Sequence, residues 1–292
     1  MGNIKQQTKE QTKKEGGRLL TRNFLIRTLV GIGLLLLIGV PAWLGGYWFF
    51  ALNAILCMIG LWEFLRVFGI DRHPAGIPAY TGSVLYLCAL GLGKTSLLAP
   101  AVIMTFLLTA AFYVFFFQKT DSVKTMASFF GFFYTVVLLS YLYRVRNGED
   151  GLLLLGMTFI AAWGTDVFAY LTGILFGKHK MAPVLSPKKS WEGAIGGLLG
   201  AALLGALLGH LFRDHFSGIG TPVAASAMIC LLGGLISMVG DLTASAFKRN
   251  HGVKDYSRLF PGHGGVLDRF DSVILIAPLV YYLSLLFRIS PV

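Results

Sequence analysis

Charge is scarce in this chain, and so are cysteines. Only 13% of the 292 residues are charged, whereas 55% are hydrophobic, which is too apolar for a soluble domain. The three cysteines, Cys57, Cys88 and Cys230, fall within apolar runs, so their spacing supports neither a disulfide framework nor a metal cluster. We expect each of them to be a packed or lipid-facing small residue.

Targeting and lipidation signals are lacking as well. The first apolar run begins only after Arg22 and is too long for the apolar region of a secretory signal peptide. The opening M-G-N-I-K-Q has no Ser or Thr at the sixth position, where a myristoylation signal would carry one. Residues 1–22 are polar and rich in lysine and arginine, so we predict a basic cytoplasmic tail that contacts anionic lipid.

Apolar segments near membrane length are what the chain has in abundance. They predict an all-α fold, a polytopic integral membrane protein with nine transmembrane helices, of which the third and the fifth are short. The expected spans are 24–41, 47–68, 78–92, 98–118, 127–143, 151–176, 191–213, 222–249 and 265–288.

The net charge of +11 is divided between the two sets of loops that these spans create. If the tail is inside, most cations lie in inside loops, and few lie in the opposite connections. Those few are Lys94, Arg144, Arg146 and Arg213, with Arg288 near the outer end of the last span. Such an asymmetry predicts a cytoplasmic N-terminus and explains the charge by orientation in the bilayer, without a nucleic-acid partner.

Acidic residues within the apolar segments lie mainly in the second half of the chain. The last four spans contain Asp166, Glu192, Asp241, Asp268 and Asp271, whereas the first five have few internal charges. We therefore expect residues 23–150 to form a transmembrane scaffold and residues 151–292 to form the catalytic region.

Asp166 lies near the middle of the sixth span. Tyr170, Gly173 and Gly177 follow it at four, seven and eleven residues, so all four would share one face of a helix. A carboxylate within the membrane is costly, which favours a function. The alternative is a structural hydrogen bond, with the glycines allowing close helix packing.

The next loop contains S-P-K-K-S-W-E-G at 186–193. Ser190 can cap a helix that begins at Trp191, so Lys188 and Lys189 would precede a helix N-terminus, where anions bind well. The alternative is an ordinary positively charged inside loop. We assign the small residues of G-A-I-G-G-L-L-G, which begins at Gly193, to helix packing.

A polar stripe marks the end of the eighth span. Asp241, Ser245 and Lys248 fall at i, i+4 and i+7. Two helical turns, or about 10 Å, separate Asp241 from Lys248. This separation favours a ligand or metal between the two side chains over a simple neutralising pair.

The polar connection that follows, within residues 245–271, is rich in cations and glycines. Its cations suit a polyphosphate, and nearby aspartates suit the divalent ion that accompanies one. Gly264 and Gly265 would let the backbone approach a phosphate, while Asp268, at the start of the last span, could bind the metal.

The stretch 245–271 resembles the signature of the bacterial phosphatidate cytidylyltransferases, or CDP-diacylglycerol synthases. The similarity extends to D-V-F-A-Y-x-x-G from Asp166 and to S-P-K-K-S-W-E-G, whereas the first five spans match only in general character. The matching signature residues are Ser245, Phe247, Lys248, Arg249, Lys254, Asp255, Ser257, Phe260, Pro261, His263, Gly264, Gly265, Val266, Asp268, Arg269, Phe270 and Asp271.

The resemblance implies that CMP is transferred from CTP to phosphatidate, which gives CDP-diacylglycerol and pyrophosphate. It implies a cytoplasmic site in a bacterial inner membrane, Mg²⁺ with a second, monovalent cation such as K⁺, and a homodimer. The metal ligands would be Asp241 and Asp268. No general base is expected, because a phosphate monoester is already ionised near neutral pH.

The candidate site residues fall into two groups. The catalytic group is Asp241, Asp268, Lys248, Arg249, Lys254 and Asp255. The substrate-binding group is Asp166, Tyr170, Ser186, Lys188, Lys189, Ser245, Arg258, His263, Gly264, Gly265, Arg269 and Asp271. We expect the polar faces of spans six and eight to line a funnel that opens sideways to the lipid.

Two other functions would explain part of this pattern. An ion-coupled transporter would also place Asp166 and Asp241 in the membrane. That function would not explain the long polar connection within residues 245–271, which is rich in glycine and cations. Another CDP-lipid transferase, the CDP-alcohol phosphotransferase type, would carry D-G-x2-A-R…G-x3-D-x3-D. That pattern is absent, since D-G at 150–151 is followed by leucines.

Overall fold

The computed structural model describes residues 31–260, 262 and 264–288. The tail 1–22 and His263 therefore lie outside the described residues. A helix over Gly31–Leu44 comes first. It is followed by α2 (Gly46–Val67), α3 (Ile77–Gly91), α4 (Leu98–Phe115), α5 (Ser122–Gly131), α6 (Tyr141–Arg146), α7 (Gly151–Phe159), α8 (Thr165–Phe176), β1 (Lys180–Ala182), β2 (Ser186–Ser190), α9 (Trp191–Leu211), α10 (Pro222–Asn250) and α11 (Leu267–Leu286).

The fold is that of an all-α integral membrane protein, in agreement with the sequence. Seven helical segments within the described residues are long and apolar enough to cross a membrane. The helix Gly31–Leu44 is shorter, and α3 has only 15 residues, as expected for a short third span. Whether these two also cross the bilayer, which would make nine spans, stays a prediction.

The prediction that the fifth span is short is wrong. The helical segment runs over 25 residues, from Ser122 to Arg146, with a π-helical turn over Phe132–Leu138 between α5 and α6. It begins early because the Asp121 carboxylate accepts the backbone N–H of Lys124 at 2.7 Å and so caps the helix. The first turn is too polar to be recognised from its hydropathy.

The sixth span has the predicted limits but is not a regular helix throughout. A π-helical turn over Ile160–Gly164 joins α7 to α8 just before Asp166. Such turns are rare and often lie near functional sites. Gly177 is the C-cap of α8 with extended backbone angles, so it does not continue the helical face of Asp166 as predicted.

The loop after α8 contains the two named strands of the described residues. β1 and β2 pair in antiparallel fashion, a hairpin that the sequence analysis did not predict. Ser190 ends β2 and caps α9 by accepting the backbone N–H of Gly193 at 3.2 Å, which confirms the predicted start of this helix. The hairpin thus leads directly into the first turn of α9.

Glycines let α9 pack closely between α8 and α10. A Cβ atom at Gly197 would lie 2.8 Å from the carbonyl oxygen of Thr165 on α8, and one at Gly205 would lie 2.5 Å from that of Ser226 on α10. These approaches are closer than a side chain permits. Gly197 belongs to the run that begins at Gly193, so the prediction that this run serves helix packing is confirmed, and Gly205 extends the same packing to α10.

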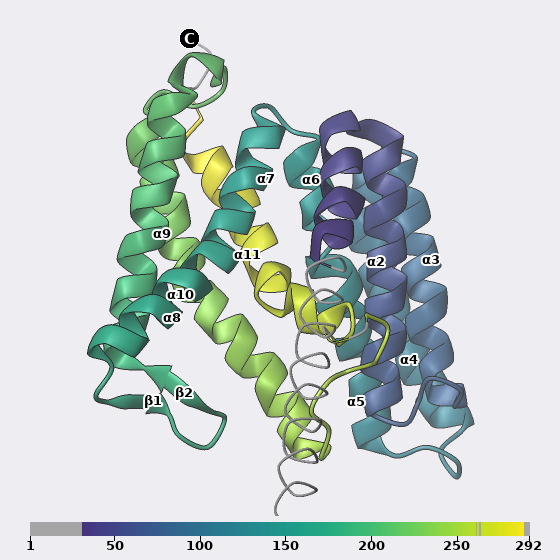
Figure 1. Ribbon diagram of the computed structural model, residues 1–292. Coiled ribbons are helices and arrows are strands. Elements are labelled where there is room, and N and C mark those ends of the chain that lie inside the picture. Colours follow the sequence, from purple (N-terminus) through teal and green to yellow (C-terminus); the bar gives the residue numbers. More distant parts are fainter. Residues whose placement is uncertain (1–30, 261, 263, 289–292) are drawn as a thin grey trace, which may run out of the picture.

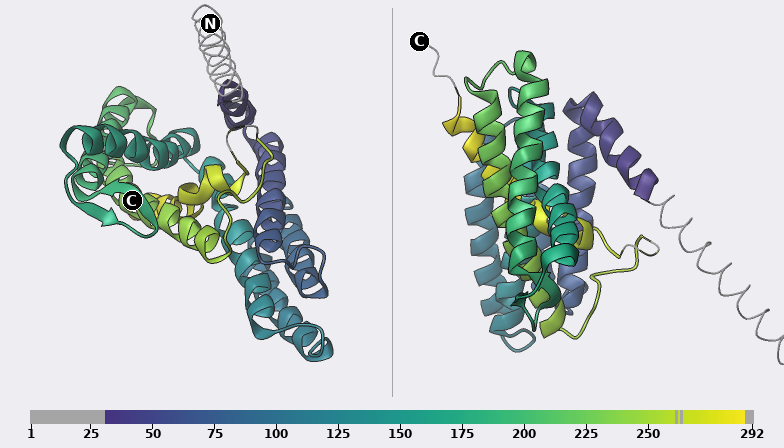
Figure 2. Two further views of the ribbon diagram at one scale, coloured as in Figure 1. Left: turned by 60° about the horizontal axis from the view of Figure 1, so that its bottom comes forward. Right: turned by 60° about the vertical axis from the view of Figure 1, so that its left-hand side comes forward.

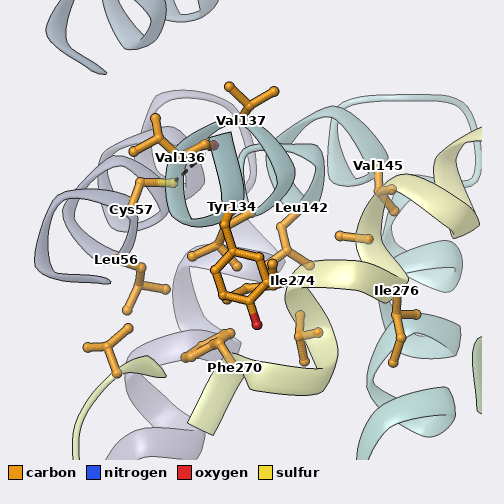
Figure 3. Close-up of a cluster of buried hydrophobic side chains, with 14 of the residues drawn as sticks. Leu56, Cys57, Tyr134, Val136, Val137, Leu142, Val145, Phe270, Ile274 and Ile276 are labelled. Carbon is orange, nitrogen blue, oxygen red and sulfur yellow. Dashed lines mark hydrogen bonds between the residues drawn. The ribbon is translucent and has the colours of Figure 1, made fainter. Parts of the chain in front are cut away.

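Helix α11 joins the two halves of the chain. It packs against α10 from the second half and against α2 and α6 from the first, and α10 and α11 lie between the two groups of helices in Figure 2. Figure 3 shows the shared core, in which Leu56 of α2, Tyr134 of the π-helical turn and Phe270 of α11 lie together. Both Cys57 and Cys230 are buried and unpaired, while Cys88 is exposed, as expected.

The hairpin, the end of α10 and the end of α2 lie at one end of the molecule, at the bottom of Figure 1. At the other end, Arg146 donates to the carbonyl oxygens of Ala42 and Trp43. The two sets of loops that the charge pattern separates therefore lie at opposite ends. Residues 251–260 lead away from the end of α10, and residues 264–266 lead into the first turn of α11 (Figure 1).

Candidate functional site

Two ion pairs form the centre of the candidate site. Lys189, at the end of β2, places its Nζ 2.6 Å from Oδ2 of Asp241 on α10. Lys248, two turns further along α10, places its Nζ 2.8 Å from Oδ1 of Asp268 on α11. Asp241 and Lys248 therefore do not neutralise each other; each has a partner from a different segment. The structure brings together the three regions that the sequence analysis selected.

Asp268 binds backbone groups of the loop between α10 and α11. Its side chain is only 3% exposed, and its Oδ2 accepts the backbone N–H groups of Tyr256 and Gly265, both at 2.9 Å. With Lys248 on Oδ1, both carboxylate oxygens are bound. A buried carboxylate needs such partners, and here they fix the path of the loop between α10 and α11.

Tyr256 covers the Lys248 side of this ion pair. Its ring centroid lies 5.4 Å from Nζ of Lys248, within range of a cation–π interaction. Its hydroxyl donates to the carbonyl oxygen of Ala244 at 3.3 Å. Burial raises the pKa of the Tyr256 hydroxyl well above its usual range, so this residue serves as a neutral wall of the site.

Glu63 on α2 is a site residue that the sequence analysis missed. It is fully buried, and its carboxylate accepts the hydroxyl of Ser257 at 2.6 Å and the backbone N–H groups of Val266 and Leu267 at 2.9 and 2.8 Å. It thereby caps α11, where a negative charge is favourable. The signal was present, since Glu63 is an acid inside an apolar span.

Backbone conformation and close packing explain why glycines stand at the two positions before α11, an explanation that the sequence analysis did not identify. Gly264 has φ +81°, and its N–H donates to the carbonyl oxygen of Phe260. Gly265 packs against the Glu63 carboxylate so closely that a Cβ would clash with it. Both N–H groups are used inside the loop and are not directed at a ligand, so the assignment of these glycines to phosphate contacts stays a prediction.

A cavity of about 230 Å³ lies between the hairpin, α8, α9 and α10 (hereafter the hairpin pocket). Five of the predicted substrate-binding residues line it, namely Asp166, Tyr170, Ser186, Lys188 and Lys189. Sequence positions up to 23 residues apart therefore converge on one concave site beside the first ion pair.

A second, polar cavity of about 550 Å³ lies between the end of α2 and the loop after α10. Three predicted residues line it, Lys254, Asp255 and Arg258, and Arg66 of α2 joins them. Arg66 was not among the predicted site residues. Its position shows that the first half of the chain contributes a charge to this cavity.

The remaining predicted residues lie close to these features. Ser245 is half-buried on α10 between Asp241 and Lys248, and Arg249 is exposed one residue after Lys248. Arg269 is exposed in the first turn of α11. Asp271 is half-buried one turn after Asp268, and its backbone packs against Gly240, the residue before Asp241.

The carboxylates of this site suit a hard cation such as Mg²⁺. No group of three or more histidine, cysteine, aspartate and glutamate side chains in the described residues is arranged to hold a metal ion. Magnesium commonly uses one or two carboxylates and takes its other ligands from substrate phosphates and water. Asp241 and Asp268 have the oxygen ligands that such an ion needs, but in this structure each carboxylate binds a lysine, so their assignment as metal ligands stays a prediction.

Comparison with known proteins identifies the family of the chain. The model of the "Cytidylyltransferase family" matches residues 25–287. A phosphatidate cytidylyltransferase of a Synechocystis species is 31% identical over 90% of this chain and 96% of its own length. Relatives with the same name from Haemophilus influenzae and Staphylococcus saprophyticus are 46% and 40% identical, each over 50% of this chain and about half of the relative. The chain therefore belongs to the cytidylyltransferase family.

Proposed function

We propose that this chain is a phosphatidate cytidylyltransferase, a nucleotidyltransferase that converts CTP and phosphatidate to CDP-diacylglycerol and pyrophosphate in phospholipid biosynthesis. The observation that carries the proposal is the pair of neighbouring lysine–aspartate contacts, Lys189 with Asp241 and Lys248 with Asp268. They join three chain segments at a partly buried polar site in an otherwise apolar protein. The relatives' names specify the reaction for which such a site is suited.

The reaction makes one P–O bond and breaks another. An oxygen of the phosphatidate phosphate attacks the α-phosphorus of CTP, and pyrophosphate leaves with the electrons of the broken bond. Negative charge grows on the leaving group, so fixed cations that face it lower the barrier. Lys189 and Lys248 supply such cations, and the aspartates that bind them limit their motion.

Other cations hold the parts of the nucleotide that do not react. Lys188 lines the hairpin pocket together with Lys189, and Lys254 and Arg258 line the polar cavity together with Tyr256, which binds Asp268. Charge-assisted contacts of this kind bind phosphates strongly. We assign the triphosphate to the space that Lys188, Lys254 and Arg258 flank.

Asp241 and Asp268 are the residues that would hold Mg²⁺, with a second, monovalent cation such as K⁺ nearby. When bound, the magnesium ion would neutralise charge on the phosphates of CTP. Asp271 supports this centre through its charge and its position next to Asp241.

The orientation and assembly of the chain are part of the same proposal. The cation-rich loops at the hairpin end would face the cytoplasm of a bacterial cell, with the protein in the inner membrane. We also propose a homodimer and no nucleic-acid partner.

The direct test uses the purified full chain in lipid vesicles that contain phosphatidate. With labelled CTP and Mg²⁺, we expect labelled CDP-diacylglycerol and one pyrophosphate for each lipid product. Vesicles in which diacylglycerol replaces phosphatidate should give neither, because diacylglycerol has no phosphate to attack with. No lipid product from phosphatidate over a range of Mg²⁺ and K⁺ concentrations would refute the proposal.

A further inference from the structure

A groove separate from the hairpin pocket lies beside the first turn of α11. It has a volume of about 310 Å³ and is formed by the helix Gly31–Leu44, the π-helical turn before α8 and the start of α11. Its main lining side chains are Leu34, Leu35, Ile38, Trp163, Arg269 and Phe270. We call it the Arg269 groove, because Arg269 is the charged residue among apolar ones.

Arg269 lies near one boundary of the apolar region. Glu63 is one turn before the end of α2, and it binds the first turn of α11. Arg269 follows two residues after the start of that turn, so its backbone is close to the level at which α2 ends. A long arginine side chain can reach from there to the polar surface, where lipid phosphates lie.

The groove extends from this level into the apolar part of the protein. The far end of the helix Gly31–Leu44 is held at the opposite side of the molecule, where Arg146 donates to the Trp43 carbonyl oxygen. Leu34 and Ile38 are one turn apart on the same helix, and Ile38 is the more buried of the two. The polar group of the groove is therefore at its outer end, and the apolar groups lie deeper.

Charge also favours an anionic occupant. Within the described residues, no carboxylate forms an ion pair with Arg269, and its side chain is exposed. A guanidinium group matches a phosphate with two parallel hydrogen bonds. The preceding residue, Asp268, belongs to the central ion pair with Lys248, so the groove adjoins the helical turn that carries part of the proposed reaction centre.

We propose that the Arg269 groove binds phosphatidate, with its phosphate on Arg269 and the upper part of its acyl chains against Leu34, Ile38 and Trp163. The lipid enters from the bilayer between the helix Gly31–Leu44 and α11. This inference rests on the proposed function. It assigns the lipid entrance to a different place from the sequence analysis, which expected it between spans six and eight.

The first test compares phosphatidates with long and with six-carbon acyl chains. Leu34→Trp fills the groove, so the ratio of kcat/KM for the long-chain lipid to that for the short-chain lipid should fall by roughly tenfold or more. The matched control is Leu37→Trp, on the same helix, 49% exposed and outside the groove, which should keep the wild-type ratio. Equal losses for both lipids in Leu34→Trp would overturn the proposal.

The second test measures binding without turnover. Purified protein is mixed with equal amounts of phosphatidate and diacylglycerol of the same chains, and the retained lipid is identified by native mass spectrometry. The wild type should prefer phosphatidate, Arg269→Ala should lose the preference, and Arg269→Lys should recover part of it. Arg72→Ala, an exposed arginine outside the groove, should behave as the wild type.

The outcomes separate the two proposals. Unchanged preference in Arg269→Ala would overturn the groove, even if the protein makes CDP-diacylglycerol. A wild type that prefers phosphatidate through Arg269 but makes no lipid nucleotide would overturn the proposed reaction and leave the binding site intact.

Discussion

Asp241 and Asp268 differ in what their carboxylates already bind. Asp241 has one oxygen on Lys189 and is partly exposed, whereas Asp268 is almost buried and binds Lys248 and two backbone N–H groups. An asparagine at position 268 would keep the shape but present an N–H₂ group where acceptors are needed. The change to asparagine should therefore destabilise the fold more at position 268 than at position 241, although both aspartates have the same proposed chemical role.

We predict that Asp241→Asn and Asp268→Asn both abolish turnover, because each loses the charge that a cation centre needs. Only Asp268→Asn should also lower the thermal stability, since it leaves buried groups without good partners. Asp271→Asn should give a milder loss of activity. Turnover and melting temperature in detergent decide this, and substantial residual activity in both of the first two variants would contradict the two-carboxylate assignment.

Lys189 tests whether the cations act on phosphate or only on membrane orientation. Lys189→Ala should cost at least about 2 kcal/mol in kcat/KM, the scale of one lost charged contact in the transition state. Lys124→Ala removes a cation at the same end of the molecule, where Lys124 pairs only with Asp121 on the surface. If both variants lose the same activity, the lysines contribute only through orientation.

Glu63 is expected to position the site without touching substrate. In Glu63→Gln the amide can still accept hydrogen bonds through its oxygen, but its N–H₂ group would face the N–H groups of α11. We expect a loss of about 1–3 kcal/mol of stability and a lower kcat, because Asp268 is in the turn that Glu63 caps. The KM for CTP should change less than kcat. Wild-type kcat in Glu63→Gln would show that the cap is not needed for catalysis.

At the scale of the elements, two of the described α-helices begin with an N-cap residue whose own side chain accepts a backbone N–H, and one of the two lies beside the site. Ser190 caps α9 directly after Lys189, whereas Asp121 caps α5, away from the ion pairs. Caps of this type contribute about 1 kcal/mol each. Because the two caps should stabilise the fold about equally and only Ser190 lies beside the site, removing each in turn separates an effect on stability from an effect on catalysis.

We predict that Ser190→Ala and Asp121→Ala lower the melting temperature by similar amounts, while only Ser190→Ala lowers kcat/KM. The reason is that Lys189 depends on the end of β2 for its position opposite Asp241. Thermal unfolding and steady-state kinetics on the same preparations make the comparison. Equal activity in the two variants would mean that the hairpin holds Lys189 without the cap.

At the scale of the whole molecule, the charge asymmetry and the site must share one face of the membrane. A cysteine at Ser245, in a protein without the exposed Cys88, should react with a membrane-impermeant thiol reagent from the cytoplasmic side. CTP with Mg²⁺ should slow this reaction, because Ser245 lies between Asp241 and Lys248 on α10. Labelling from the opposite side alone would overturn both the orientation and the location of the site.

A cysteine at Asn147 is the matched control. Asn147 is exposed at the other end of the molecule, so it should react only from the opposite side, and nucleotide should not protect it. Protection of this position would show that CTP changes the structure as a whole instead of covering the site.

The sequence by itself determined the class of fold and most of the local chemistry. Runs of apolar residues need a bilayer or a core regardless of their partners, so the described helices other than the fifth lie within a few residues of their predicted limits. Ser190 could be recognised as a cap because capping depends on neighbours in the chain. The glycines of α9 and the acids and lysines of the site could be selected for similar local reasons.

Only the tertiary structure decided which charges meet. Asp241 and Lys248 share a helical face and suggested one shared ligand, yet each binds a residue from another segment, because ion pairing depends on distance in space. Glu63 is 194 residues from Ser257 and binds it directly, which no local pattern could reveal. The hairpin pocket, the polar cavity and the Arg269 groove exist for the same reason: each is formed by elements that only packing brings together.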